Sequence, residues 1–222
     1  MLKRTLMTAA AACVLASVPA YAAVTISATP GSDPYTGPVP TYDFESAAPT
    51  TGGAVQTGSS GTGAQPFGST GNYWTVGPAA TSPGILDLTS FAEIFSISFI
   101  WGSVDDYNTL EVLGAADAVL ASFTGVDVAL PPDGNRVDPA KNPLVTLLFT
   151  GADTTNVAKL RLKSTQNAFE TDNYAINAVP EPGTWAMMLL GFGMIGFSLR
   201  KRKAGQGAAR LRVSFDQAPR LA

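Results

Sequence analysis

The chain has 222 residues, a formal net charge of −3 at pH 7, no histidine and a single cysteine. The lack of histidine excludes Ser-His-Asp and Cys-His catalysis and histidine-ligated zinc. One cysteine cannot form a disulfide within the chain, so a scaffold stabilised by internal disulfides is excluded as well.

The first 22 residues are typical of a secretory signal peptide. A short cationic start precedes an apolar run over residues 6–18, which is the order of the n-region and h-region of such signals. Ala20 and Ala22 provide the small residues that signal peptidase needs, so cleavage is expected before Ala23. A lipoprotein would have to use Cys13, which lies within the apolar run. We therefore expect an exported chain without a thiol.

Residues 23–179 are expected to form one exported domain, since this length is enough for a hydrophobic core. The region carries 15 carboxylates and five cations, so its net charge is −10. An acidic domain repels phosphate backbones, which argues against nucleic acid as a partner.

Short segments with alternating apolar and polar residues, bounded by Gly, Pro and Asn, run through this domain and predict strands. The clearest is residues 94–101, where Phe95, Ile97, Phe99 and Trp101 share one face. Residues 50–72 are rich in Gly, Ser and Thr and predict a long loop or hairpin tip. The other predicted strands are 41–45, 73–76, 85–88, 109–113, 119–124, 144–150, 157–163 and 174–178.

Many short strands without crossover helices predict an all-β domain, an antiparallel β-sandwich, with a jelly-roll as the preferred form. Tyr-Asp-Phe-Glu at residues 42–45 and Phe-Glu-Thr-Asp-Asn-Tyr-Ala-Ile at residues 169–176 resemble the first and last strands of carbohydrate-binding-module-like sandwiches. An immunoglobulin-like sandwich is the alternative. The resemblance implies that the first and last strands are neighbours.

Neighbouring terminal strands would bring together Asp43, Glu45, Asp172 and Asn173. Calcium takes 6–8 oxygen ligands in irregular geometry, so these residues predict a structural Ca²⁺ site. Alternatively, Asp172 and Asn173 only cap a turn while Asp43 is solvated.

Aromatic and charged side chains suggest two further kinds of site. Trp74, which follows the Gly-rich region, is a candidate for stacking on a sugar ring, with burial in the core as the alternative. The row Lys159, Arg161 and Lys163 predicts an exposed strand face at a sheet edge, or a surface that attracts an acidic exopolysaccharide.

Without histidine, hydrolysis would need two carboxylates facing each other across a cleft. Asp105, Asp106 and Glu111 are the candidates. Adjacent aspartates in a strand point to opposite faces, and this stretch is more typical of a turn. A catalytic role is therefore not expected.

The C-terminal region contains three signals in fixed order. A Pro-Glu-Pro sequence comes first, and proline makes this segment extended and unable to join a central strand. An apolar run over residues 185–199 follows and predicts a transmembrane helix, although about 20 residues are usual for a span. The cations that should stop translocation are Arg200, Lys201, Arg202 and Lys203.

This order resembles the PEP-CTERM sorting signal, in the variant with Trp-Ala behind the prolines. The resemblance implies recognition by exosortase, a membrane-embedded cysteine protease or transpeptidase, and cleavage near the proline pair. It covers residues 180–203, whereas residues 204–222 are expected to be a disordered cytoplasmic tail. The residues that carry it are Pro180, Glu181, Pro182, Trp185, Ala186 and the basic stop.

The sequence therefore predicts an exported structural or binding protein that passes signal peptidase, a membrane-anchored intermediate and exosortase. It would end at the cell surface or in the extracellular matrix, associated with exopolysaccharide. The alternatives are a carboxylate-based extracellular hydrolase and a passive adhesion or matrix protein without a ligand site.

Overall fold

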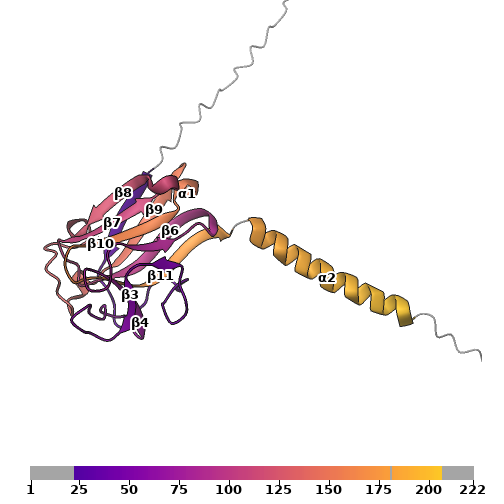
Figure 1. Cartoon of the computed structure of the whole chain (residues 1–222), viewed down its shortest axis with the longest axis horizontal. Helices are drawn as coiled ribbons and strands as arrows, with labels where there is room; N and C mark the ends of the chain where they lie inside the picture. The colour runs from indigo at the N-terminus through magenta and orange to yellow at the C-terminus, as the bar shows by residue number, and fades with distance from the viewer. Residues whose placement is uncertain (1–22, 181, 207–222) are drawn as a thin grey trace, which may run out of the picture.

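The computed structural model describes residues 23–180 and 182–206. Two antiparallel sheets pack face to face, and one long helix follows them (Figure 1). The six-stranded sheet has the order β1-β9-β6-β11-β4-β3, and the five-stranded sheet has the order β2-β5-β10-β7-β8. The predicted antiparallel β-sandwich is confirmed at this level.

The elements have the following bounds. The strands are β1 (Ala23–Thr29), β2 (Thr50–Thr51), β3 (Ala54–Thr57), β4 (Asn72–Val76), β5 (Gly84–Asp87), β6 (Phe91–Gly102), β7 (Asn108–Leu113), β8 (Val119–Thr124), β9 (Leu144–Thr150), β10 (Lys159–Ser164) and β11 (Phe169–Pro180). The helices are η1 (Ala115–Asp117), η2 (Gly125–Asp127), η3 (Pro139–Lys141), α1 (Asp153–Asn156) and α2 (Pro182–Gln206).

Most predicted strands are present, and β8 and β9 have the predicted bounds. The predicted strand at residues 41–45 is wrong, because only Tyr42 pairs, in an isolated bridge with Tyr174 of β11. Phe44 has a φ of 61°, a left-handed conformation that no strand contains. The predicted adjacency of this segment to the last strand is nevertheless present.

Aromatic side chains fill the space between the sheets. Phe99 stacks on Tyr174 with ring centroids 4.8 Å apart, and Trp101 stacks on Phe169 at 4.3 Å. The pattern that puts Phe95 on one face with Ile97, Phe99 and Trp101 predicts that it is buried with them, but Phe95 is 38% exposed. A register shift between β6 and β11 leaves Phe95 as an extra residue, and buried Ile94 takes the next inward position.

Two segments cover the outer face of the six-stranded sheet, and we call residues 30–41 and 58–71 the covering loops. Residues 58–71 connect β3 and β4, as the Gly-rich composition predicted, but residues 50–57 of the predicted loop contain strands β2 and β3. Asn142 ties this second loop to the sandwich, because its Oδ1 accepts hydrogen bonds from the backbone N of Phe67 and Ser103. The loops bury the part of this face that carries Glu170 and Asp172.

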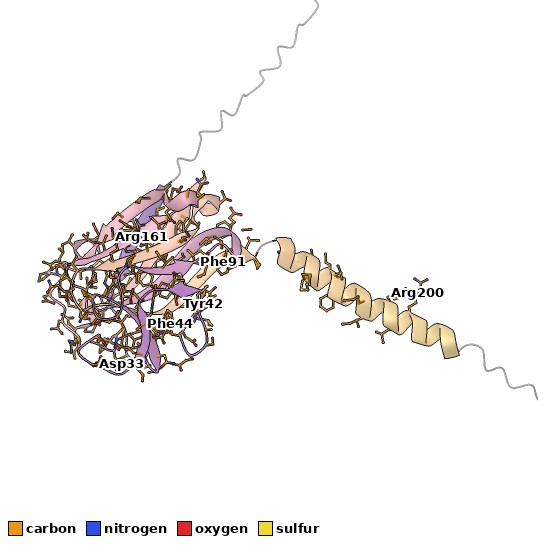
Figure 2. All side chains as sticks on the ribbon, viewed as in Figure 1. Asp33, Tyr42, Phe44, Phe91, Arg161 and Arg200 are labelled. Atoms are coloured by element: carbon orange, nitrogen blue, oxygen red, sulfur yellow. The ribbon has the colours of Figure 1, made fainter. Side chains whose placement is uncertain are left out.

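The helix α2 lies clear of the sandwich in Figure 1. Its large apolar side chains are exposed, from Trp185 at 49% to Leu199 at 56%, and the Arg200 side chain points away from the helix (Figure 2). Within the described residues, no helix is both long enough and apolar enough to cross a membrane, so the predicted transmembrane helix is not supported. Residues 204–206 continue α2, which corrects their expected disorder.

Candidate functional site

The sorting segment leaves the sandwich directly from its last strand. Val179 and Pro180 pair with Glu93 and Phe91 of β6, so β11 ends at Pro180. This corrects the expectation that the prolines keep the segment out of the sheet. A proline is tolerated there because Pro180 follows a register shift in the ladder, and bulges are among the places where a strand accommodates proline. Figure 2 labels Phe91 at the end of the sandwich nearest α2.

The structure describes only some of the predicted processing residues. Ala20, Ala22 and Glu181 are outside the described residues, whereas Ala23 is the first residue of β1. Pro182 begins α2, and the basic stop at residues 200–203 forms part of the same helix.

The four residues of the predicted calcium site do not form a ligand set. Asp43 Oδ1 accepts a hydrogen bond from the Glu45 backbone N, and both Glu45 oxygens accept from amide nitrogens of Asn72. Asn173 adopts a φ of 56° in a bulge. Among residues 23–180 and 182–206, no group of three or more acidic, histidine or cysteine side chains is placed to hold a metal ion. The calcium prediction is not supported.

Asp172 is instead a buried carboxyl beneath the second covering loop, with 1% of the residue exposed. Its Oδ2 accepts a hydrogen bond of 2.6 Å from Ser69, and its Oδ1 accepts one from the Asn173 backbone N. Burial raises the pKa of Asp172 to about 7, and the negative charges of Asp43 and Glu45 add to the rise.

Glu170 is a second buried carboxyl on the same face of β11 and was not among the predicted site residues. Its two oxygens accept hydrogen bonds of 2.8 Å from the Ala64 backbone N and the Ser103 hydroxyl. Burial raises the pKa of Glu170, partly offset by these donors. Alternation along residues 169–172 places Glu170 and Asp172 on one face, so the signal was available in the sequence.

Trp74 is 0% exposed and belongs to the core, so it cannot stack on a sugar and that candidate is wrong. Its ring lies 6.1 Å from Phe44, and its Nε1 donates to the Gly52 backbone O. The hydrophobic effect explains why Trp74 is buried. Its strand β4 lies inside the sheet, with β11 and β3 on either side.

Two of the three carboxylates considered for hydrolysis have partners, whereas Asp106 is exposed. Asp105 accepts a hydrogen bond of 2.6 Å from the Tyr107 hydroxyl. Glu111 lies between Arg161 and Lys163 at 2.5 Å from each, and these charges lower its pKa despite its burial. Lys159 pairs with Asp117 at 2.7 Å. The cationic row is therefore paired, and it lies on an interior strand of the five-stranded sheet rather than at an edge.

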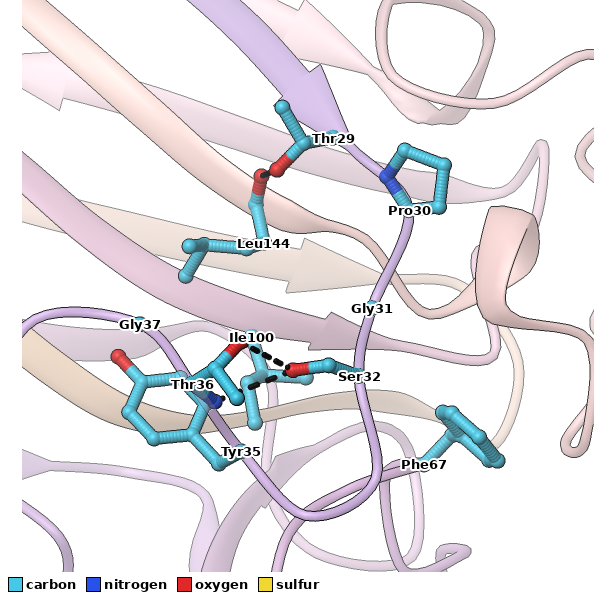
Figure 3. Close-up of a pocket in the computed structure, with 10 residues that line it drawn as sticks. All are labelled: Thr29, Pro30, Gly31, Ser32, Tyr35, Thr36, Gly37, Phe67, Ile100 and Leu144. Carbon is cyan, nitrogen blue, oxygen red and sulfur yellow. Dashed lines mark hydrogen bonds between the residues drawn. The ribbon is translucent and has the colours of Figure 1, made fainter.

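Two hollows lie on the covered sheet face. A cavity of about 90 Å³ sits under the first covering loop, where Ser32 and Thr36 hydroxyls bond at 2.9 Å (Figure 3). A more open groove of about 280 Å³ lies beside Pro38 and Val39, and its other residues come from β6 and β11. Those residues are Ser96, Ser98, Ala175, Ile176 and Asn177, so the groove carries no charge.

An acidic sandwich is followed by a helix with exposed apolar side chains and a basic end, which is the order expected of a C-terminal sorting tail. Comparison with protein families matches residues 178–203 to the PEP-CTERM protein-sorting motif. The chain therefore carries a PEP-CTERM motif, which marks it as an extracellular protein targeted to exosortase. No curated protein and no solved structure matches the chain.

Proposed function

We propose that this protein is a non-enzymatic structural or adhesion component of the cell surface or extracellular matrix, released from a membrane-associated intermediate by exosortase. The observation that carries the proposal is the PEP-CTERM motif at residues 178–203, which directly follows the sandwich. Signal peptidase would act first and exosortase second. The sandwich is then the part delivered outside the cell.

The environments of Glu111 and Glu170 support a structural rather than a hydrolytic role for these two carboxylates. Glu111 is neutralised by two cations, and Glu170 is buried beneath a covering loop. A glycosidase needs two carboxyls that both reach a substrate in a cleft, and neither of these side chains is free to do so.

Sorting is tested by following the C-terminus of the full-length protein in cells that contain exosortase. Mass spectrometry of protein released from the surface should find no peptide beyond Gly191. A Pro180→Ala/Pro182→Ala variant should stay cell-associated with α2 attached, whereas an Asp106→Asn variant, changed on the exposed surface, should be released normally. Released protein that still ends at Ala222 would contradict the proposal.

We further propose that the matrix contact is with a neutral exopolysaccharide. The groove beside Pro38 and Val39 offers hydroxyl and amide groups from Ser96 and Asn177 and no charge. The net charge of −10 over residues 23–179 would repel a polyanion. Cosedimentation should therefore show binding to a neutral glucan and little to a polyuronate. An Asn177→Ala variant should bind the glucan more weakly, and equal binding to both polymers would refute this assignment.

A further inference from the structure

The folded sandwich contains the beginning of the sorting motif. The match to the PEP-CTERM motif starts at Ala178, while β11 continues to Pro180. Three residues of the signal are therefore paired with β6 in the folded protein. A protease binds its substrate as an extended, accessible chain, and a bond beside an ordered sheet becomes accessible only by local opening.

No spacer separates the sandwich from α2. Pro180 is the last residue of β11 and Pro182 is the first of the helix, so the connection spans at most about 7 Å. An enzyme that approaches the prolines would meet the sandwich at once. Either the enzyme accepts a folded strand end, or the strand end must detach.

The pairing at this corner is weak. Register shifts interrupt the β6–β11 ladder between Asn177 and Ala178 and again between Val179 and Pro180. Each shift leaves one residue of β6 without an opposite partner, which disrupts the ladder locally. Pro180 also has no N–H to donate.

The other side of the strand end is open. β4 pairs only with residues 169–171 of β11, and the segment at Tyr42 bridges Tyr174. The Ile176 backbone N donates to the Thr41 hydroxyl, which is the last hydrogen bond on that side. Among the described residues, no strand pairs there with residues 177–180. The exposure of β11 rises accordingly, and Val179 is 38% exposed.

We propose that residues 177–180 form a releasable strand end, and that exosortase processing requires them to separate from β6. This inference rests on the proposed exosortase processing. The bulged, one-sided pairing allows separation while Phe169, Thr171 and Tyr174 remain buried in the sandwich. The first half of β6 thereby positions the sorting motif and limits its access to the enzyme.

A disulfide lock tests this step in the full-length protein. Ser96 and Asn177 are register partners, so Ser96→Cys/Asn177→Cys should bond in the oxidising compartment outside the inner membrane. Thr25→Cys/Leu148→Cys joins register partners on the same sheet face without touching β11 and is the matched control. Both variants are compared with the wild type by the rate at which α2 is lost, measured by mass.

We expect the lock to slow processing by more than about tenfold, since a disulfide adds a free-energy cost to opening. The control should be processed at the wild-type rate. Insertion of Gly-Ser-Gly-Ser after Val179 in the locked variant should restore processing, because the motif would then be free while the sandwich stays closed.

Other results would overturn the inference. Wild-type processing of the locked variant would show that residue 177 need not separate from β6, which contradicts the proposed release of residues 177–180. Equal slowing of the control, or no rescue by the spacer, would show a general effect of the disulfide. These results would leave the proposed function intact, whereas a wild type that keeps α2 would refute both.

Discussion

In both sheets, apolar and polar residues alternate along the strands, but the polar side chains on the two outer faces have different environments. On the five-stranded sheet, the outward cations of β10 lie near solvent, and each pairs with a carboxylate. On the six-stranded sheet, Glu170 and Asp172 occupy outward positions of β11 but are buried under the covering loops. Hydroxyl and backbone N–H groups, rather than cations, bond these two carboxyls.

This difference shows that a polar residue at an outward strand position is not necessarily a surface residue. Exposed ion pairs contribute little to stability because water screens them and ordering the side chains costs entropy. A carboxyl removed from water without a cation instead carries a desolvation penalty that hydrogen bonds offset only in part. The covering loops therefore change the energetics of the sheet face beneath them.

The largest change in the free energy of unfolding is expected on the inner face of β6. Phe99 is fully buried and stacked on Tyr174, so Phe99→Ala should lower the free energy of unfolding by about 3–5 kcal/mol through lost burial and a cavity. Phe95→Ala, in the bulge on the same strand, should cost less than about 1.5 kcal/mol. Urea unfolding of the mature protein measures both. Equal costs would mean that Phe95 is buried and the bulge is absent.

The covered face should make stability depend on pH through Asp172. The pKa of Asp172 is about 7 in the folded protein, compared with 3.8 for an aspartate in the unfolded chain. The folded state therefore keeps a proton that the unfolded state loses, and stability should fall as pH rises from about 4 to 7 and level off above. Asp172→Asn should remove this part of the slope and stabilise the protein at pH 8 by about 1–3 kcal/mol.

Thermal unfolding of the wild type and Asp172→Asn at pH 4 and pH 8 measures this effect. The two proteins should be similar at pH 4 and separate at pH 8. Asp106→Asn removes an exposed carboxylate and is the control, since it should leave the slope in place. A destabilised Asp172→Asn at pH 8 would show that the buried carboxylate contributes favourably as an anion.

Ser98 tests whether the neighbouring part of this face is also protected. It is 7% exposed, and its hydroxyl bonds to that of Thr146 at 2.9 Å. Ser98→Ala should cost about 0.5–1.5 kcal/mol because a buried hydroxyl loses its partner. Ser96→Ala, next along the same face and more exposed, should be close to neutral. Identical values measured by urea unfolding would place both residues in solvent.

The smallest effect is expected on the five-stranded sheet. Lys159→Ala removes an exposed ion pair with Asp117 and should change the free energy of unfolding by less than about 0.5 kcal/mol. The change should shrink further in 1 M salt. A larger, salt-independent loss in urea unfolding would show that this outer face is also buried.

The sequence correctly predicted features that depend on residues close together along the chain. Alternation identified β8 and β9 with their bounds. The same rule failed at Phe95, because a bulge depends on how two strands pair and leaves no local signature. β1 was missed although Val24 and Ile26 alternate with polar residues and pack on the core.

By itself, the sequence determined the sorting motif, the antiparallel β class and the nearness of residues 41–45 to the last strand. The β class follows from the period of two in a strand, whereas the sorting motif and the nearness of residues 41–45 to the last strand were implied by resemblances to known families. Only the tertiary structure decided that Trp74 is buried, that Asp172 has no metal partner among the described residues, and that β11 extends into the sorting motif. The reason is physical, because burial and pKa depend on which distant segments cover a side chain, and strand ends depend on the partner strand.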